Sequence, residues 1–389
     1  MKKIFIGGCP FGSENIGDDA IIGSMVNSFE KNHQLTIAAK SGKNQDYIEK
    51  YLANKSKNLQ VFFNEFYSNP IMGMIINSKR TPLMAFFNNQ KNKNRLKGND
   101  LFICGGGTLI TDMPAHLIKM LMHARRQAIP TVIFGVGMAE IKYKNLTNQL
   151  VKELNHLQDI YVRDEFVKIK LNKIGVADEK IKICHDPAIC LQPNTSFDIQ
   201  QYLSTEQINH YNNGNVNIGI TLSSEKDVKD RTALNKVSTL INHLTKTYSA
   251  NVFLIPTNYR NDEDYKFMLP LCANPNTWIV KAKFNPEDFI AFMQNFQLVI
   301  SSRLHMNILC SITGTPFIGL IRNSKIIDYS AIHSLHAYTL DELNEQTFYS
   351  YINTMIEQNA IIRKTITNKV QTLRTIHQKS VASIIYQYL

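Results

Sequence analysis

The chain alternates short apolar runs with longer segments of helical periodicity, and this alternation limits the folds open to it. KKIFIGG, LFICGGG and TVIFGVG are typical of buried strands, whereas DAIIGSMVNSFEKN and PAHLIKMLMHARRQA repeat their apolar residues at helical spacing. Strand–helix–strand repeats are joined by right-handed crossovers, which make neighbouring strands parallel. We therefore predict an α/β protein built on doubly wound parallel sheets.

The alternation is interrupted by a polar stretch at 191–215 and then resumes with VNIGITLS. A chain of 389 residues also exceeds what one hydrophobic core usually supports. We predict two Rossmann-like domains that face a cleft, as in the GT-B arrangement, followed by a helical extension. The predicted boundaries are 1–195 for the N-terminal domain, 196–213 for a linker, 214–338 for the C-terminal domain and 339–389 for the C-terminal helices.

The composition indicates a soluble protein, with 44% apolar and 19% charged residues. No apolar stretch reaches the roughly 18 residues that a transmembrane helix needs. The first apolar run is too short for a secretory signal, so we expect a cytoplasmic protein. The six cysteines lack C-x-x-C spacing and are interpreted as small buried hydrophobes.

The formal net charge is +11, from 43 Lys and Arg against 32 Asp and Glu. Readers of nucleic acid usually show clustered arginines or interleaved aromatic residues, and this pattern is missing, so no nucleic-acid partner is expected. The basic cluster KNKNRLKGN, 91–99, is interpreted as a solvated loop in preference to a membrane-surface patch. An anionic substrate or an anionic membrane lipid remains compatible with the charge.

Parallel α/β sheets bind ligands beyond the carboxyl ends of their strands, so the residues at those places carry most information. The first strand ends in GGCPFGSENIGDD, where Asp18 or Asp19 either caps the next helix or faces a substrate. The glycines of CGGGTLITD, 104–112, either bring backbone N–H groups to a polar ligand or form a tight turn. Neither stretch has the spacing of a dinucleotide-binding motif or a P-loop.

Two further strand ends carry charge. Arg163, in YVRDE, either pairs with Asp164, Glu165 or Asp186 or holds a carboxylate or phosphate with its planar guanidinium group. In HDPAI, His185 and Asp186 either pair to stabilise a turn or face the cleft.

The strongest pattern lies in LVISSRLHMNILCSITGTPFIGLIRNSKIIDYS, 298–330. Arg303 and His305 end one strand, and Lys325 follows the next. Because neighbouring parallel strands end side by side, three cationic or potentially cationic groups meet at one edge. Their convergence is costly unless an anion neutralises them, so the pattern predicts an anion site.

Together, ENIGDDAI, FICGGGTLITD, YVRDE, KICHDPAI and SSRLHMNILCSITGTPFIGL with NSKI resemble the polysaccharide pyruvyl transferase family over about residues 3–335. That family transfers the pyruvyl group of phosphoenolpyruvate to a sugar, often as a ketal across two hydroxyls, on a fold similar to GT-B glycosyltransferases. The resemblance implies a transferase of exopolysaccharide biosynthesis at the cell envelope, with phosphoenolpyruvate as co-substrate and without a metal or redox cofactor.

The resemblance also implies roles for single residues. Asp18 and His305 would be the catalytic acid and base, in an order left open, because the methylene carbon of phosphoenolpyruvate must be protonated. Departure of phosphate needs cations already in place. The implied donor-binding residues are Arg163, Arg303, His305 and Lys325, and the implied acceptor-binding residues are Asn15, Gly17, Asp18, Gly105, Gly106, Gly107 and Thr108.

Some features depart from the family or leave alternatives open. GDDA stands where the family often shows GDEA, with Asp18 retained. The stretch 69–89 matches no motif and is interpreted as an ordinary helix pair, with a lid or membrane-facing element as the alternative. A lipid-linked acceptor, peripheral contact with an anionic membrane and a homo-oligomer are all left open.

Two other functions compete with pyruvyl transfer. A GT-B glycosyltransferase with a nucleotide-sugar donor would need groups for the ribose and diphosphate, for which Glu225 and Lys226 are available. A non-catalytic member of a polysaccharide assembly complex is the second rival, and the retained Asp18, Arg303, His305 and Lys325 argue against it.

Overall fold

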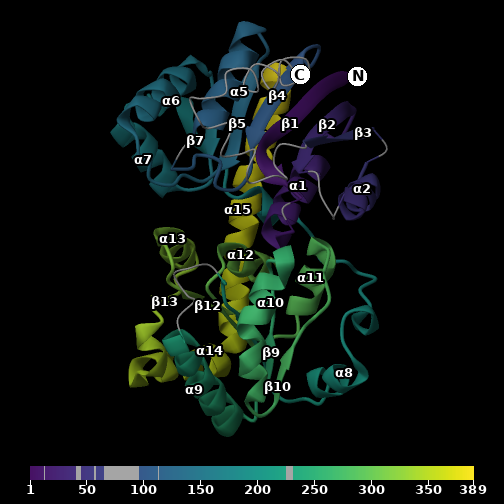
Figure 1. Ribbon diagram of the computed structural model, residues 1–389, viewed down its shortest axis with the longest axis vertical. Coiled ribbons are helices and arrows are strands. Elements are labelled where there is room, and N and C mark those ends of the chain that lie inside the picture. The colour runs from purple at the N-terminus through teal and green to yellow at the C-terminus, as the bar shows by residue number, and fades with distance from the viewer. Residues whose placement is uncertain (13, 41–44, 57, 65–95, 113, 225–230) are drawn as a thin grey trace. The chain divides into compact units, whose positions relative to one another are not determined.

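The structure is a computed structural model that describes residues 1–389 except 13, 41–44, 57, 65–95, 113 and 225–230 (Figure 1). The predicted helix pair at 69–89 and the residues Glu225 and Lys226 therefore lie outside the described residues. The chain forms two compact units. Unit 1 comprises Met1–Ser13, Asp18–Ala188 and Leu373–Leu389, and unit 2 comprises Glu14–Gly17 and Ile189–Thr372.

The described part of unit 1 contains a parallel seven-stranded sheet in the order β3-β2-β1-β4-β5-β6-β7. All residues of β4 and β5 are buried, as expected for strands covered on both faces. The strands are β1 (Lys2–Phe11), β2 (His33–Lys40), β3 (Leu59–Asn64), β4 (Leu101–Gly105), β5 (Thr131–Val136), β6 (Ile160–Val162) and β7 (Ile181–Ile183). The helices are α1 (Ile16–Phe29), α2 (Gln45–Ala53), α5 (Ala115–Arg126), α6 (Lys144–His156) and α7 (Glu165–Ile174).

Unit 2 repeats this plan with a parallel sheet in the order β10-β9-β8-β11-β12-β13. Its strands are β8 (Asn217–Thr221), β9 (Asn251–Leu254), β10 (Thr277–Ile279), β11 (Leu298–Ser301), β12 (Phe317–Leu320) and β13 (Ala337–Tyr338). Its helices are α8 (Thr205–Tyr211), α9 (Arg231–Tyr248), α10 (Glu263–Met268), α11 (Pro286–Met293), α12 (Leu304–Ile312), α13 (Ser324–Ile332), α14 (Gln346–Glu357) and the first part of α15 (Asn359–Tyr388).

The prediction of two doubly wound parallel sheets is confirmed, and both sheets have a topological switch point. The strand order reverses between β1 and β4 in unit 1 and between β8 and β11 in unit 2. Open α/β sheets bind ligands beyond the carboxyl ends of the strands at such a point. The topology therefore directs attention to the loops after these four strands.

The segment 196–213, predicted to be a linker, folds within unit 2. It includes α8, which begins with a capping box formed by Ser204 and Gln207. Tyr211 at the end of α8 is buried and stacks on Phe292, with ring centroids 5.3 Å apart. Tyr211 attaches the stretch to the core of unit 2. The polar composition of its neighbours made this buried aromatic residue hard to recognise from the sequence.

The C-terminal helices predicted at 339–389 are divided between the units. α14 packs into the core of unit 2, and α15 contributes its residues up to Thr372 to unit 2 and Leu373–Leu389 to unit 1. The buried side chains of α15 recur at helical spacing, as expected for one packed face: Ile366, Val370, Leu373, His377, Ser380, Val381 and Ile384. Among the described helices, none is both long and apolar enough to cross a bilayer.

Candidate functional site

The anion site predicted from Arg303, His305 and Lys325 lies at one edge of the sheet of unit 2. β11 and β12 are paired neighbours, with Ser301 opposite Gly319. Arg303 is the residue before α12, while His305 and Lys325 lie in the first turns of α12 and α13. The backbone N–H groups at these two helix starts add partial positive charge to the same edge. The structure therefore brings the three predicted residues to adjacent strand ends.

Arg303 is paired with a carboxylate that the sequence did not single out. Its Nη2 donates to Oδ1 of Asp264 at 2.7 Å, and the Arg303 side chain is 11% exposed. Asp264 is fully buried and also accepts the backbone N–H groups of Ser224 and Asn258, each at 3.0 Å. The protein itself thus supplies a negative charge at an edge where the sequence predicted only cations. No local pattern marks Asp264, because its role depends on residues far away in the chain.

Arg322 is a further cation that the prediction missed. Its Nη1 donates to the hydroxyl oxygen of Ser223 at 2.7 Å, and the Ser223 backbone N–H donates to the Ser302 hydroxyl at 2.8 Å. These bonds connect the ends of β8, β11 and β12. Arg322 directly follows the apolar run PFIGLI. Its place after a strand is the signal that would have identified it.

The short segment Glu14–Gly17 belongs to unit 2, although it follows the first strand of unit 1. Asn15 forms an antiparallel bridge with Asn258, beside the strand ends of unit 2. Gly17 packs against the imidazole of His305: a Cβ added to Gly17 would lie 2.3 Å from Nδ1 and 2.4 Å from Cγ of that ring. The structure therefore brings predicted acceptor residues next to a predicted donor residue.

Neither Asp18 nor Asp19 occupies the N-cap position of α1, so the N-cap alternative is wrong. The helix begins at Ile16, because the side-chain oxygen of Asn15 accepts the Gly17 N–H at 2.9 Å and supplies the cap. Asp18 and Asp19 lie in the first helical turn, where the helix dipole favours negative charge. Asp19 is buried and Asp18 half-buried.

The glycine loop after β4 lies tightly against β5. A Cβ on Gly105 would be 2.4 Å from the Phe134 carbonyl oxygen, and the Gly106 N–H donates to that same oxygen at 3.0 Å. The Gly107 carbonyl accepts the Gly137 N–H at 2.7 Å. Close packing explains these glycines, as in the tight-turn alternative. Contacts of the loop and of the half-buried Thr108 with a sugar stay a prediction.

Arg163 belongs to unit 1, whereas Arg303, His305 and Lys325 belong to unit 2. It forms the ion pairs that the sequence offered as one alternative. Its Nε donates to Asp164 at 3.1 Å, and Nη1 lies 3.6 Å from Oδ2 of Asp186. Its side chain is only 6% exposed. Asp186 also accepts the Ala188 N–H at 3.1 Å, so it stabilises the turn of HDPAI. Donor binding by Arg163 stays a prediction.

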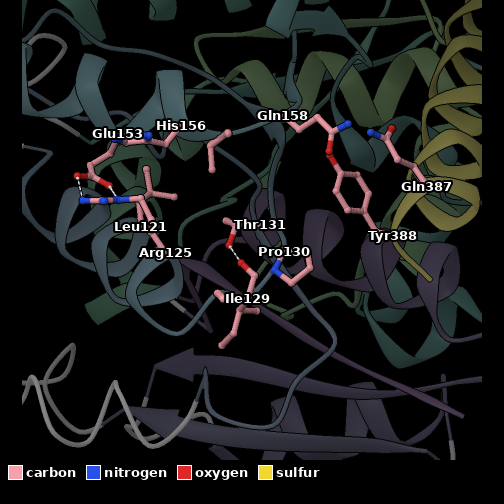
Figure 2. Close-up of a pocket in the computed structure, with 12 residues that line it drawn as sticks. Leu121, Arg125, Ile129, Pro130, Thr131, Glu153, His156, Gln158, Gln387 and Tyr388 are labelled. Atoms are coloured by element: carbon pink, nitrogen blue, oxygen red, sulfur yellow. Dashed lines mark hydrogen bonds and ion pairs between the residues drawn. The ribbon is translucent and has the colours of Figure 1, made fainter.

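A cavity of about 400 Å³ in unit 1 lies at the start of β5, at the opposite end of the strand from the switch point (Figure 2). Arg125 donates to Glu153 through two hydrogen bonds of 2.9 and 3.0 Å. Figure 2 shows these two side chains pointing toward each other, while Gln387 and Tyr388 of α15 line another side. None of the predicted site residues lines this cavity. In the described chain, no three His, Cys, Asp or Glu side chains gather as metal ligands would.

Two doubly wound sheets in succession, each with a switch point, define a two-domain α/β protein of the GT-B-like kind. The polysaccharide pyruvyl transferase family matches residues 15–324, which is most of the sequence. The chain therefore belongs to the polysaccharide pyruvyl transferase family, and it is a transferase enzyme. No curated protein sequence matches it significantly.

Solved structures with little sequence identity share the fold over nearly their whole length. HepE from Anabaena, in complex with UDP and glucose, is 12% identical with a TM-score of 0.61, covering 99% of this chain and 100% of HepE. MnaA from S. aureus with UDP is 11% identical with a TM-score of 0.68, covering 100% and 97%. The UDP-GlcNAc 2-epimerase from Neisseria meningitidis, bound to UDP-GlcNAc, is 13% identical with a TM-score of 0.64, covering 100% of each. The GT-B-like fold is thereby confirmed.

Proposed function

We propose that the protein transfers the pyruvyl group of phosphoenolpyruvate to a sugar of a cell-surface polysaccharide or of its precursor. The observation that carries the proposal is the cationic edge of unit 2, where Arg303, Arg322 and Lys325 follow two adjacent strands. A small donor with one carboxylate and one phosphate suits such an edge. Membership of the family narrows the transferred group to pyruvyl.

The side chains suit different parts of the donor. Arg303 is held by Asp264, and a guanidinium group fixed in this way can bind a carboxylate or phosphate through parallel hydrogen bonds. Lys325 adds a point charge at the start of α13. Preorganised cations stabilise the charge that develops on the departing phosphate, an effect worth several kcal/mol in enzyme sites.

The proposed reaction proceeds by addition and elimination. An acid protonates the methylene carbon of phosphoenolpyruvate while a sugar hydroxyl adds to C2 and gives up its proton. The C2–O bond to phosphate then breaks, and a second hydroxyl adds to C2, loses its proton and closes the ketal. Asp18 and His305 are the proposed acid and base. No step needs a metal ion or a redox cofactor.

We assign the acceptor to Asp18, to the loop Gly105–Thr108 in unit 1 and to Asn15 and Gly17. The first two follow β1 and β4 at the switch point of that sheet. A lipid-linked acceptor would require peripheral contact with the cytoplasmic face of a membrane, and the net charge of +11 suits an anionic surface.

Thermal unfolding with phosphoenolpyruvate, with UDP and without ligand tests the donor. A ligand present at a hundred times its Kd stabilises the folded state by about 2.7 kcal/mol. We expect phosphoenolpyruvate to raise the Tm of the wild type and of Arg125→Ala, a matched control whose arginine pairs with Glu153 in unit 1. Arg303→Ala and His305→Ala should lose the response. UDP is the ligand of HepE and MnaA in their solved structures, and stabilisation by UDP alone would favour a nucleotide-sugar donor instead.

A further inference from the structure

Asp264 contacts several parts of unit 2 that are far apart in the sequence. Its Oδ1 accepts from Nη2 of Arg303 at 2.7 Å and from the Ser224 N–H at 3.0 Å. Its Oδ2 accepts from the Asn258 N–H at 3.0 Å, with the Thr257 hydroxyl at 3.5 Å. The side chain is fully buried. One carboxylate therefore joins the loops after β8, β9 and β11.

The loop after β9 in turn holds the segment Glu14–Gly17. The Ile16 N–H donates to the Thr257 carbonyl at 3.1 Å, and the Tyr259 N–H donates to the Glu14 carbonyl at 2.8 Å. At the end of this segment Gly17 packs on the ring of His305. We call this connected set the Asp264 network: Arg303, Asp264, the loop 257–259, the segment 14–17 and His305.

We propose that Asp264 is a positioning residue that keeps Arg303 and the segment Glu14–Gly17 in a fixed relation. Calling Arg303 donor-binding and the segment 14–17 acceptor-side rests on the proposed function. The contacts of the Asp264 network do not depend on that function. If Arg303 moves, it moves the Asp264 carboxylate, and the same carboxylate accepts the Asn258 N–H. Asp264 therefore couples the arginine of the anion site to the segment that leads into Asp18.

A carboxylate is the group that this position requires. It offers acceptor sites on both oxygens, and here Oδ1 and Oδ2 each face donors. An amide of the same shape has one acceptor oxygen and one NH2 group, which would face a donor on one side. A buried donor left without its acceptor is costly, so the loops would shift to find new partners. Asp264→Asn is consequently the substitution that tests the proposal.

The experiment is hydrogen–deuterium exchange on the full chain, with and without phosphoenolpyruvate, combined with titration of the same ligand. Without ligand, Asp264→Asn should speed exchange about tenfold or more in peptides covering 14–17 and 257–259, because the Ile16 and Tyr259 N–H groups lose a fixed partner loop. Phosphoenolpyruvate should bind about 10- to 100-fold more weakly, the loss that is typical of metal sites when the hydrogen-bond partner that orients a ligand is removed.

Asp288→Asn is the matched control. Asp288 is also a buried carboxylate of unit 2, and it accepts from the side chains of Asn194, Tyr202 and Asn285, none of which belongs to the Asp264 network. The Asp288→Asn substitution should lower the free energy of unfolding. It should leave exchange at 14–17 and the affinity for phosphoenolpyruvate close to wild type. A purely structural role for Asp264 would make the two variants behave alike.

The outcomes separate this inference from the proposed function. Exchange at 14–17 that is no faster in Asp264→Asn than in Asp288→Asn overturns the positioning role, whether or not phosphoenolpyruvate binds. Faster exchange at 14–17, together with a wild type that binds no phosphoenolpyruvate, supports the positioning role and overturns the proposed donor. Should Asp264→Asn fail to fold, Arg303→Gln removes the ion pair from its other side. The same acceleration at 14–17 is then expected, and its absence overturns the inference.

Discussion

Gly17 and His305 are close neighbours in the structure although 288 positions separate their numbers in the sequence. The glycine leaves room for the imidazole ring, and it also begins the chain that continues into Asp18. Asp264 fixes the position of Arg303, because its carboxylate accepts a hydrogen bond of 2.7 Å from the guanidinium group. At the residue scale, the site depends on these two close contacts as much as on the charged groups themselves.

Gly17→Ala should therefore impair donor binding. A Cβ there would lie 2.3 to 2.6 Å from three atoms of His305, so the ring or the segment must move. Misplacement of a binding group by about 1 Å can cost about 100-fold in activity. We expect the stabilisation of the fold by phosphoenolpyruvate to fall sharply, measured by thermal unfolding.

Gly214→Ala is the control for this variant. No atom lies within 4 Å of a Cβ at Gly214, although its φ of 84° makes alanine unfavourable, by roughly 1–2 kcal/mol. That protein should lose some stability but keep its response to the ligand. A Gly17→Ala protein that responds like wild type would show that the contact with His305 does not matter for binding.

The helix α8 packs as part of unit 2, although its polar sequence is typical of a linker. Ser204 and Gln207 form its capping box, and Tyr211 at its end lies among Phe253, Phe292 and Phe296, with ring centroids 5.3 to 5.7 Å away. The Tyr211 hydroxyl donates to the Phe292 carbonyl at 2.8 Å. The element is thus tied to α11 and to the core of unit 2.

Substitutions at Tyr211 test this role. Tyr211→Phe removes only the hydrogen bond and should cost about 1 kcal/mol, whereas Tyr211→Ala leaves a cavity among aromatic rings and should cost about 3–5 kcal/mol. Urea unfolding of the full chain measures both, with Tyr386→Ala, a 94% exposed tyrosine, as the control that changes little. A loss below about 0.5 kcal/mol for Tyr211→Ala would mean that α8 behaves as a linker after all.

At the scale of the whole molecule, each unit contains a buried neutral histidine. Burial lowers the pKa of His377 in unit 1 to about 4, against the smaller opposing effects of the Cys184 carbonyl and Asp186. Burial, assisted by Lys369, lowers the pKa of His333 in unit 2 to about 3. In both cases the unfolded chain binds a proton more readily than the folded unit does. Stability is therefore complete above the unfolded pKa of 6.5 and is lost as the pH falls toward the folded pKa.

We predict that the free energy of unfolding falls by roughly 2 kcal/mol for each of these histidines between pH 7 and pH 5. His377→Gln keeps a donor for the Cys184 carbonyl, which His377 contacts at 2.9 Å, but does not titrate in this range. His377→Gln should remove the contribution of His377 alone, and His333→Gln that of His333 alone, so each variant is a control for the other. Urea unfolding at both pH values measures the slopes, and a wild-type slope in either variant would contradict its assignment.

Several residues of the site could be predicted from local sequence patterns, because those patterns have the same meaning in any parallel α/β fold. Arg303, His305 and Lys325 were predictable because they follow apolar strand runs, and parallel strands end at one edge. Arg322 carries the same signal after PFIGLI. Asp264 carries no such signal, because it sits in a short polar helix and acquires its role only through Arg303, Ser224 and Asn258.

The sequence by itself determined the two parallel sheets and the charged residues at the strand ends, because the spacing of apolar residues encodes strands, helices and the faces that they bury. Only the tertiary structure decided between alternatives that share the same local pattern. It placed Arg163 between two carboxylates, gave the cap of α1 to Asn15, tied α8 to unit 2 and set Gly17 against His305. These choices depend on which distant residues pack together, and the packing of distant residues is not encoded in local periodicity.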